Sequence, residues 1–200
     1  MSVTYWNAYD EGYLRAHQWA LALAHGTKMP QEVAAIRLGP GEVAHSRIAP
    51  VEVAGYYGDN VEYRPSLFLV GGPVGLAVTG AASIAHNQMK KAEAQRAATP
   101  RWHRLGTAEV LVTNQRMAVT GNGRTGSFWY AELSPLQLIV GQGGSPAVQF
   151  QPDNQPVLLF ESAWAPMLYV FVHHLVDGRP PGLNIPAGLL ERAKSQGRLR

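Results

Sequence analysis

An uncharged stretch of small and apolar residues at positions 67–85 constrains the possible folds of this chain most. Its 19 residues read LFLVGGPVGLAVTGAASIA, and Lys90 and Lys91 follow closely. An apolar helix of about 20 residues can cross a bilayer, and basic residues commonly flank the cytoplasmic end of such a span. Gly71-Gly72-Pro73, however, interrupts the stretch. Three interpretations therefore stay open: a buried strand followed by a helix, a segment partly inserted into a membrane surface, and a membrane span.

The net charge of +3 is distributed unevenly along the chain. Residues 86–104 and residues 179–200 each carry +4, which leaves −5 on the remainder. Basic stretches attract phosphate-rich surfaces, although such a run also serves as a solvated face. The acidic body opposes binding to long nucleic acids, and no recognition helix, zinc finger or RNA-binding aromatic signature is present. We therefore do not expect a nucleic-acid partner.

The composition predicts a folded, cytoplasmic protein. With 5 Trp, 8 Tyr and 5 Phe and 46% hydrophobic residues, the chain can bury a core. It has no cysteine, which excludes disulfides, thiolate metal sites and a cysteine nucleophile. The first residues lack the basic and apolar regions of a signal peptide. We expect a cytoplasmic location, peripheral at the membrane if the apolar stretch contacts one.

Helical and strand patterns alternate along the rest of the chain, which predicts an α+β fold. Apolar residues recur at helical spacing over residues 5–25 and 163–175, with shorter helical pieces expected over 30–36 and 189–195. A further helix begins after Pro73 and becomes basic before Pro100. Short apolar or alternating runs separated by Gly, Pro, Asn and Asp predict antiparallel strands. They cover residues 42–57, 60–70, 105–113, 116–120, 126–133, 137–140, 147–151 and 157–161.

The pattern GNGRTG at residues 121–126 formally matches a nucleotide-binding loop. A dinucleotide site requires this loop to open a helix, whose free amides bind the pyrophosphate. Here SFWYAEL follows, which is typical of a strand. We therefore predict a hairpin turn in which glycine and Asn122 supply positive φ angles.

Signatures of catalysis and metal binding are missing from the sequence. The seven histidines lack the spacing of a zinc site, and GxSxG and the Walker pattern do not occur. The carboxylates are scattered, so no catalytic pair can be named. We expect no catalytic, cofactor-binding or metal-binding residues and no enzymatic activity.

Two short motifs carry a family resemblance. Arg101-Trp102-His103-Arg104 precede a glycine and then a strand that ends in Thr113-Asn114-Gln115-Arg116. This corner resembles a hairpin motif of GRAM and bacterial PH-like domains, and Leu38-Gly39-Pro40-Gly41-Glu42 resembles the start of their first strand. Turn-forming Thr and Asn side chains bond local backbone, and Arg116 can pair across the hairpin. The corner residues thus also have a purely structural interpretation.

The resemblance implies a PH-like bent antiparallel sheet or split barrel closed by a C-terminal helix, with an N-terminal helix and an inserted small-residue helix. We expect an N-terminal helical segment at residues 1–37 and a PH/GRAM-like domain at 38–176, with the helical insertion at about 73–99. A basic tail that contains Pro and Gly follows at 177–200.

The resemblance implies a binding module, because PH-like folds bind lipids, peptides or proteins; the fold alone does not choose among them. We predict a non-enzymatic module that contacts an anionic membrane surface through the apolar segment and the basic helix, since two weak anchors together give stable attachment. The alternative is a soluble protein-interaction or self-assembly module. The predicted binding residues are Lys90, Lys91, Arg96, Arg101, Trp102 and Arg104.

Overall fold

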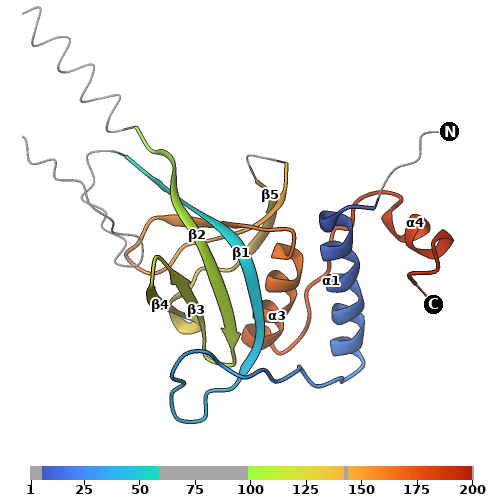
Figure 1. Cartoon of the computed structure of the whole chain (residues 1–200), viewed down its shortest axis with the longest axis horizontal. Coiled ribbons are helices and arrows are strands. Elements are labelled where there is room, and N and C mark those ends of the chain that lie inside the picture. Colours follow the sequence, from blue (N-terminus) through green and yellow to red (C-terminus); the bar gives the residue numbers. More distant parts are fainter. Residues whose placement is uncertain (1–5, 59–98, 142–143, 200) are drawn as a thin grey trace, which may run out of the picture.

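The computed structural model describes residues 6–58, 99–141 and 144–199 (Figure 1). The helices of this part of the chain are α1 (Ala8–Ala24), α3 (Ala165–Asp177) and α4 (Leu189–Ser195), with a 3-10 helix at Tyr130–Glu132. The strands are β1 (Ala44–Tyr57), β2 (Arg101–Thr113), β3 (Arg116–Gly121), β4 (Arg124–Trp129), β5 (Gln137–Val140), β6 (Pro146–Phe150) and β7 (Val157–Glu161). The strand expected over 60–70 and the uncharged stretch with its helix lie outside the described residues.

All seven strands form one antiparallel sheet in the order β4-β3-β2-β1-β7-β6-β5. The sheet consists of two meanders, which join where β7 pairs with β1. The register between β1 and β2 shifts near Pro50, and such bulges bend a strand and accommodate a residue that lacks an N–H. Figure 1 shows β1 and β2 as long, curved strands. The predicted α+β class with an antiparallel sheet is confirmed, and this open sheet is compatible with a PH-like fold.

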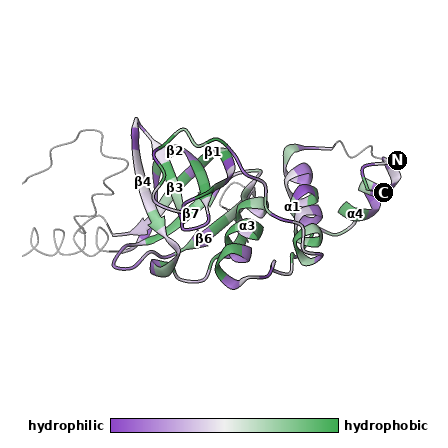
Figure 2. Cartoon of the chain, turned by 90° about the horizontal axis from the view of Figure 1, so that it is seen from below, coloured by the Kyte–Doolittle hydropathy of each residue, from purple (hydrophilic) through white to green (hydrophobic). Residues whose placement is uncertain are grey.

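Helix α3 covers one face of the sheet and closes the hydrophobic core. Phe150 and Phe160 from the sheet meet edge to face with ring centroids 4.9 Å apart, and both are almost fully buried. Figure 2 shows hydrophobic residues concentrated on α3 and on the strands. Helix α1 packs against α3, where the rings of Trp19 and Phe171 lie 5.4 Å apart. The core therefore joins the N-terminal helix to the sheet domain through α3.

The ends of α1 agree with the helix predicted over residues 5–25. Asn7 caps the N-terminus by accepting a hydrogen bond from the Asp10 amide, and the Asp10 carboxylate accepts one from the Asn7 amide. This reciprocal pair satisfies two amides that the helix itself cannot bond. At the other end, Gly26 adopts φ = 81°, which ends the helix where His25-Gly26 predicts a stop.

The helical piece predicted over residues 30–36 is wrong. These residues form no helix and instead cross the outer face of the sheet. Ala34, Ile36 and Leu38 pack there against a small cluster of Ala44, Leu111 and Ala118. The three packed side chains are two residues apart, a spacing that does not place them on one face of a helix. Their packing on the sheet outweighs the weak stability of a short helix.

The hairpin turn predicted for GNGRTG is confirmed. Asn122 and Gly123 have φ angles of 51° and 72°, and the flanking residues Gly121 and Arg124 pair across the turn. Two central residues with positive φ are what a tight hairpin of this type requires.

The C-terminal basic stretch docks on the start of α1. Arg192 lies 2.8 Å from the carboxylate of Asp10, and Arg198 lies 2.9 Å from that of Glu11. Arg198 also stacks over Trp6, with its guanidinium carbon 4.5 Å from the ring centroid. Part of the positive charge of residues 179–200 is therefore balanced within the protein.

Candidate functional site

The described members of the predicted binding set lie at the start of β2. Arg101, Trp102 and Arg104 belong to this strand, and both arginines are exposed. Lys90, Lys91 and Arg96 lie outside the described residues. The strand begins at Arg101 rather than at residue 105 as predicted, because these residues pair with β1.

An aromatic pair covers the outer face at this end of the sheet. Tyr56 lies directly opposite Trp102 in the register, and their ring centroids are 5.3 Å apart. Tyr56 remains 42% exposed. Tyr and Trp side chains of this kind, with an apolar body and a polar tip, are typical of surfaces at a boundary between water and a less polar phase.

A second ring pair reinforces the same end of the two strands. Tyr57 stacks on His103 with centroids 4.2 Å apart, and the His103 ring nitrogen Nε2 lies 3.1 Å from the Tyr57 carbonyl oxygen. Tyr57 itself pairs with Arg101. The two tyrosines could not be predicted as part of this site, because 43 residues lie between Tyr57 and Arg101 and the register between the strands cannot be read from the sequence.

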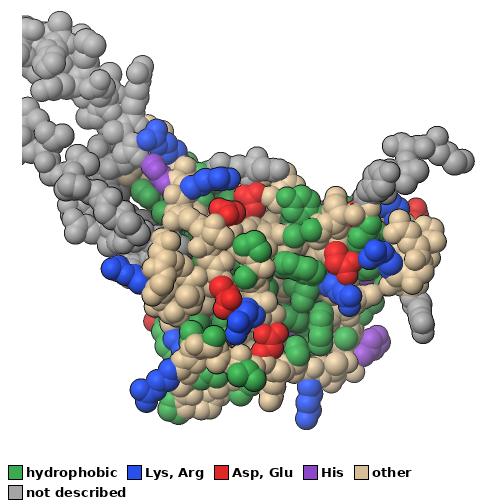
Figure 3. Space-filling model, viewed as in Figure 1, with side chains coloured by type: hydrophobic (Ala, Val, Ile, Leu, Met, Phe, Trp, Pro, Cys, Tyr) green, Lys and Arg blue, Asp and Glu red, His purple; other side chains and the backbone are tan. Residues whose placement is uncertain are grey.

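The basic character is local to this end of β1 and β2. Farther along the outer face, Arg47 pairs with Glu109 at 3.5 Å, and Glu52 accepts a hydrogen bond from Thr107. Those charges are mixed in sign. Figure 3 shows Lys and Arg side chains with a histidine at the upper left, which is where β1 ends and β2 begins in Figure 1.

Both predicted anchors belong to the part of the sequence that connects β1 to β2. Because Tyr57 and Arg101 are opposite each other, the chain leaves and re-enters the sheet at neighbouring points. The uncharged stretch at 67–85 and the basic residues Lys90, Lys91 and Arg96 all belong to the segment between these points. We call the end formed by Tyr56, Tyr57 and residues 101–104 the β1–β2 tip.

The corner motif after β2 forms a buried ion-pair network. Arg116 holds Glu42 with two bonds, from Nε to Oε1 at 2.7 Å and from Nη2 to Oε2 at 3.0 Å. The Thr113 hydroxyl donates to the same carboxylate at 2.9 Å, and the Gly39 amide donates at 2.7 Å. Tyr130 extends the network by donating to the Thr113 carbonyl.

Asn114 and Gln115 bind the same neighbouring segment through its backbone. The Asn114 side chain accepts from the Val43 amide at 2.8 Å and donates to the Gly41 carbonyl at 3.0 Å, while Gln115 donates to Pro40. The two motifs that carry the family resemblance are therefore bonded to each other. Since nearly all their polar groups are used internally, the corner has a structural role.

The ion pair makes the network sensitive to acid. Bonds from Arg116, with those from Gly39 and Thr113, hold the pKa of Glu42 below its usual 4.5, although burial acts to raise it. A carboxyl with a lowered folded-state pKa stabilises the fold fully above its unfolded-state pKa, and this stabilisation is lost as the pH falls through the folded-state value.

We therefore expect the free energy of unfolding to decrease as the pH falls below about 4.5, the ordinary value for this carboxyl. Glu42→Gln should flatten this part of the profile while lowering stability at neutral pH. Urea unfolding at a series of pH values measures both effects. Glu109→Gln, which alters an exposed ion pair, is the control. Parallel profiles for Glu42→Gln and the unaltered protein would contradict the expectation.

Three comparisons with known proteins found no match to this chain. The chain matches no protein-family model, no curated protein and no solved structure. Within residues 6–58, 99–141 and 144–199, no helix combines the length and apolar character needed to cross a bilayer. The same residues contain no group of three or more potential His or carboxylate metal ligands. The protein is thus defined by its open seven-stranded antiparallel sheet and covering helices.

Proposed function

We propose that the protein is a non-enzymatic, PH/GRAM-like binding module that contacts an anionic membrane surface with its β1–β2 tip. One observation carries the proposal: strand pairing places Tyr56 and Trp102, with Arg101 and Arg104, at the end of the sheet where β1 stops and β2 begins, and the uncharged stretch lies between these two strands in the sequence. The strand order and the C-terminal helix are compatible with the fold that the family resemblance implies.

The expected membrane affinity is the sum of two weak contributions, one electrostatic and one apolar. A basic residue close to an anionic surface contributes about 1 kcal/mol, and amphipathic rings favour the headgroup region. Neither contribution alone holds a protein on a membrane, but apolar and electrostatic contacts together do. The peripheral location that we propose follows from this pairing of contacts.

Co-sedimentation of the full chain with vesicles tests the proposal. We expect binding to phosphatidylcholine vesicles that contain phosphatidylserine, weaker binding to phosphatidylcholine alone, and release by salt. Arg101→Gln/Arg104→Gln should weaken binding roughly tenfold to thirtyfold, since about 1 kcal/mol is lost at each position. Lys90→Gln/Lys91→Gln should have a similar effect.

A matched control separates local contact from net charge. Lys28→Gln/Arg179→Gln removes the same charge from exposed residues in the loops after α1 and α3. We expect this variant to bind vesicles almost as the unaltered protein does. Absence of binding at low salt, or equal weakening by the tip and control variants, would refute the membrane proposal.

A further inference from the structure

A cavity lies where the N-terminal helix and the C-terminal tail meet the sheet domain. It measures about 240 Å³, and its lining comes from α1, β5, α3 and the loop between α3 and α4. Three of the lining residues lie outside residues 38–176, so segments that the family resemblance does not cover build part of this cavity. The lining residues are Tyr13, Leu138, Ile139, Val140, Tyr169, Gly182 and Asn184.

The loop that contributes Gly182 and Asn184 is anchored at both ends. It leaves the end of α3 and enters α4, whose residues Leu189 and Ala193 are fully buried. Two ion pairs join the C-terminal stretch to the start of α1. The tail therefore has a defined place beside α1, and the cavity forms between them and the sheet.

Three polar side chains of this cavity have no hydrogen-bond partner in the described part of the chain. They are those of Tyr13, Tyr169 and Asn184. The two tyrosines are half-buried and Asn184 is exposed, so a small molecule can reach them from solvent. Burial raises the pKa of both Tyr13 and Tyr169, so each phenol stays neutral and can donate as well as accept. Polar groups partly removed from water are stabilised by a ligand that bonds them.

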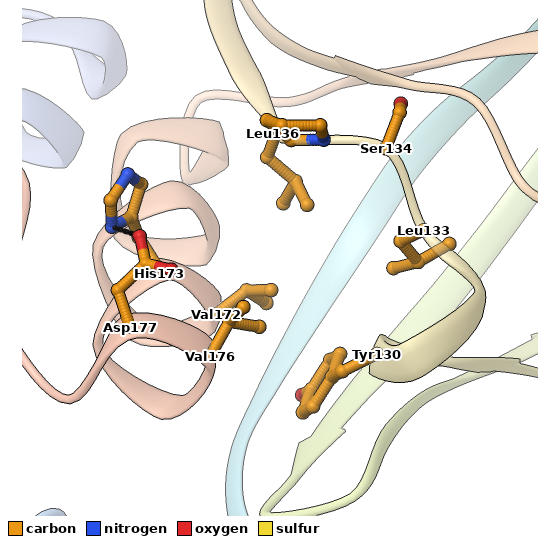
Figure 4. A pocket seen from close by; sticks show the side chains of 9 residues that line it. Tyr130, Leu133, Ser134, Leu136, Val172, His173, Val176 and Asp177 are labelled. Carbon is orange, nitrogen blue, oxygen red and sulfur yellow. Dashed lines mark ion pairs between the residues drawn. The ribbon is translucent and has the colours of Figure 1, made fainter.

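A second cavity, of about 150 Å³, offers no such groups (Figure 4). It lies between α3 and the chain that precedes β5 and shares no lining residue with the first. Its polar side chains already have partners within the protein: Tyr130 with the Thr113 carbonyl, Ser134 with the Gln151 amide, and Asp177 with His173 at 2.7 Å. Only the first cavity therefore combines space with polar groups that await a ligand.

Charge, size and shape define the ligand of the first cavity. None of the residues that line it is charged, so a phosphate or a carboxylate finds no cation there. A cavity of about 150 Å³ holds benzene, so one of about 240 Å³ has room for a bicyclic ring. Residues 138–140 supply Leu, Ile and Val side chains for the face of such a ring. A sugar would place hydroxyls against these apolar groups, and an alkyl chain would leave the phenols and the amide without a partner.

We propose that this cavity binds an uncharged purine ring, as a free base or a nucleoside. The Asn184 amide bonds an adjacent donor and acceptor on the ring edge, which is how asparagine recognises adenine. The hydroxyls of Tyr13 and Tyr169 bond the remaining polar atoms of the ring, and its face packs on residues 138–140. This site is separate from the β1–β2 tip and goes beyond the membrane contact proposed there.

Titration of the isotopically labelled full chain with adenine, followed by nuclear magnetic resonance, tests the inference. We expect saturable binding, with the largest shifts in the amides of residues 138–140 and 182–184. Adenosine should bind comparably, and AMP should bind no more tightly than adenosine because its phosphate finds no cation. Indole has a similar size but one donor and no acceptor, so it should bind roughly tenfold more weakly than adenine.

Single substitutions test the three polar groups. Tyr13→Phe and Tyr169→Phe each remove one hydroxyl and should weaken adenine binding roughly two- to tenfold. Asn184→Leu replaces the amide by an apolar group of similar size and should weaken binding by at least as much. Tyr9→Phe is the matched control, because Tyr9 lies on the same helix, is 43% exposed and does not line the cavity. It should leave adenine binding unchanged.

Circular dichroism checks the fold of each variant, and if one of the three cavity variants does not fold, the other two decide. The inference is overturned if adenine does not bind, if indole binds as tightly as adenine, or if AMP binds much more tightly than adenosine. It is also overturned if the cavity variants bind adenine as the unaltered chain does. None of these outcomes depends on vesicle binding at the β1–β2 tip.

Discussion

Arg116→Met is expected to lower the free energy of unfolding by about 3–5 kcal/mol, because it leaves a buried carboxylate without its counter-charge. The side chain of Glu42 is 0% exposed and that of Arg116 is 15% exposed, so water cannot replace the guanidinium. The substitution also removes the stacking of Arg116 on Trp129. Urea unfolding at neutral pH, extrapolated linearly to water, measures the loss.

Arg47→Met provides a control on the same sheet. Arg47 and Glu109 are 39% and 36% exposed and lie 3.5 Å apart, and exposed pairs contribute only about 0–1 kcal/mol. The double variant Arg116→Met/Glu42→Gln should be more stable than Arg116→Met, since it leaves no buried charge. Equal losses for Arg116→Met and Arg47→Met would show that the corner does not depend on this ion pair.

Elements with a strong local pattern could be predicted closely from the sequence. The strand Val157–Glu161 and the helix Leu189–Ser195 occupy the predicted residues, and the hairpin at Asn122-Gly123 follows from turn chemistry alone. In each case the local preference and the tertiary environment favour the same conformation. The strand alternation and closely spaced turns were likewise sufficient for the α+β class.

Features decided by contacts between distant residues could not be predicted in this way. Residues 101–104 are polar and basic and follow Pro100, so they have little strand character until β1 pairs with them. Residues 30–36 form no helix because alternate side chains of this segment pack on an apolar face of the sheet. The sequence indicated Trp102 and its arginines as a candidate site, but only the register adds Tyr56.

The buried network around Glu42 and Arg116 also combines motifs that are visible in the sequence with a contact between distant residues that is not. Both motifs of the family resemblance were visible as short patterns, and a bond from Arg116 across the hairpin was one expectation. Arg116 does bond across the strands, to Thr113 at the corner and to Ser127 on β4. Its ion pair, however, extends to Glu42, 74 positions away in the chain. No local rule relates the two residues, because their proximity results from the pairing of β1 with β2. The carboxylate is the group that makes this corner sensitive to the Arg116 substitution.

Gly12→Ala is expected to destabilise the protein by about 1–3 kcal/mol, the usual cost of overpacking a buried contact. A Cβ at this position would lie 1.8 Å from the Ala163 carbonyl oxygen and 2.9 Å from its carbon. These are backbone atoms, so α1 itself must move away from the turn that precedes α3. Alanine favours a helix over glycine by at most about 1 kcal/mol, which is too little to offset the clash.

The displacement should be detectable where α1 meets α3. Trp19 packs on Phe171 across this contact, so Gly12→Ala should change near-ultraviolet circular dichroism as well as the urea midpoint. Gly182→Ala is the matched control, because a Cβ there meets no atom within 4 Å and needs no positive φ; it should be neutral or slightly stabilising. A Gly12→Ala protein as stable as the unaltered chain would mean that the α1–α3 contact is looser than the close approach of Gly12 to Ala163 requires.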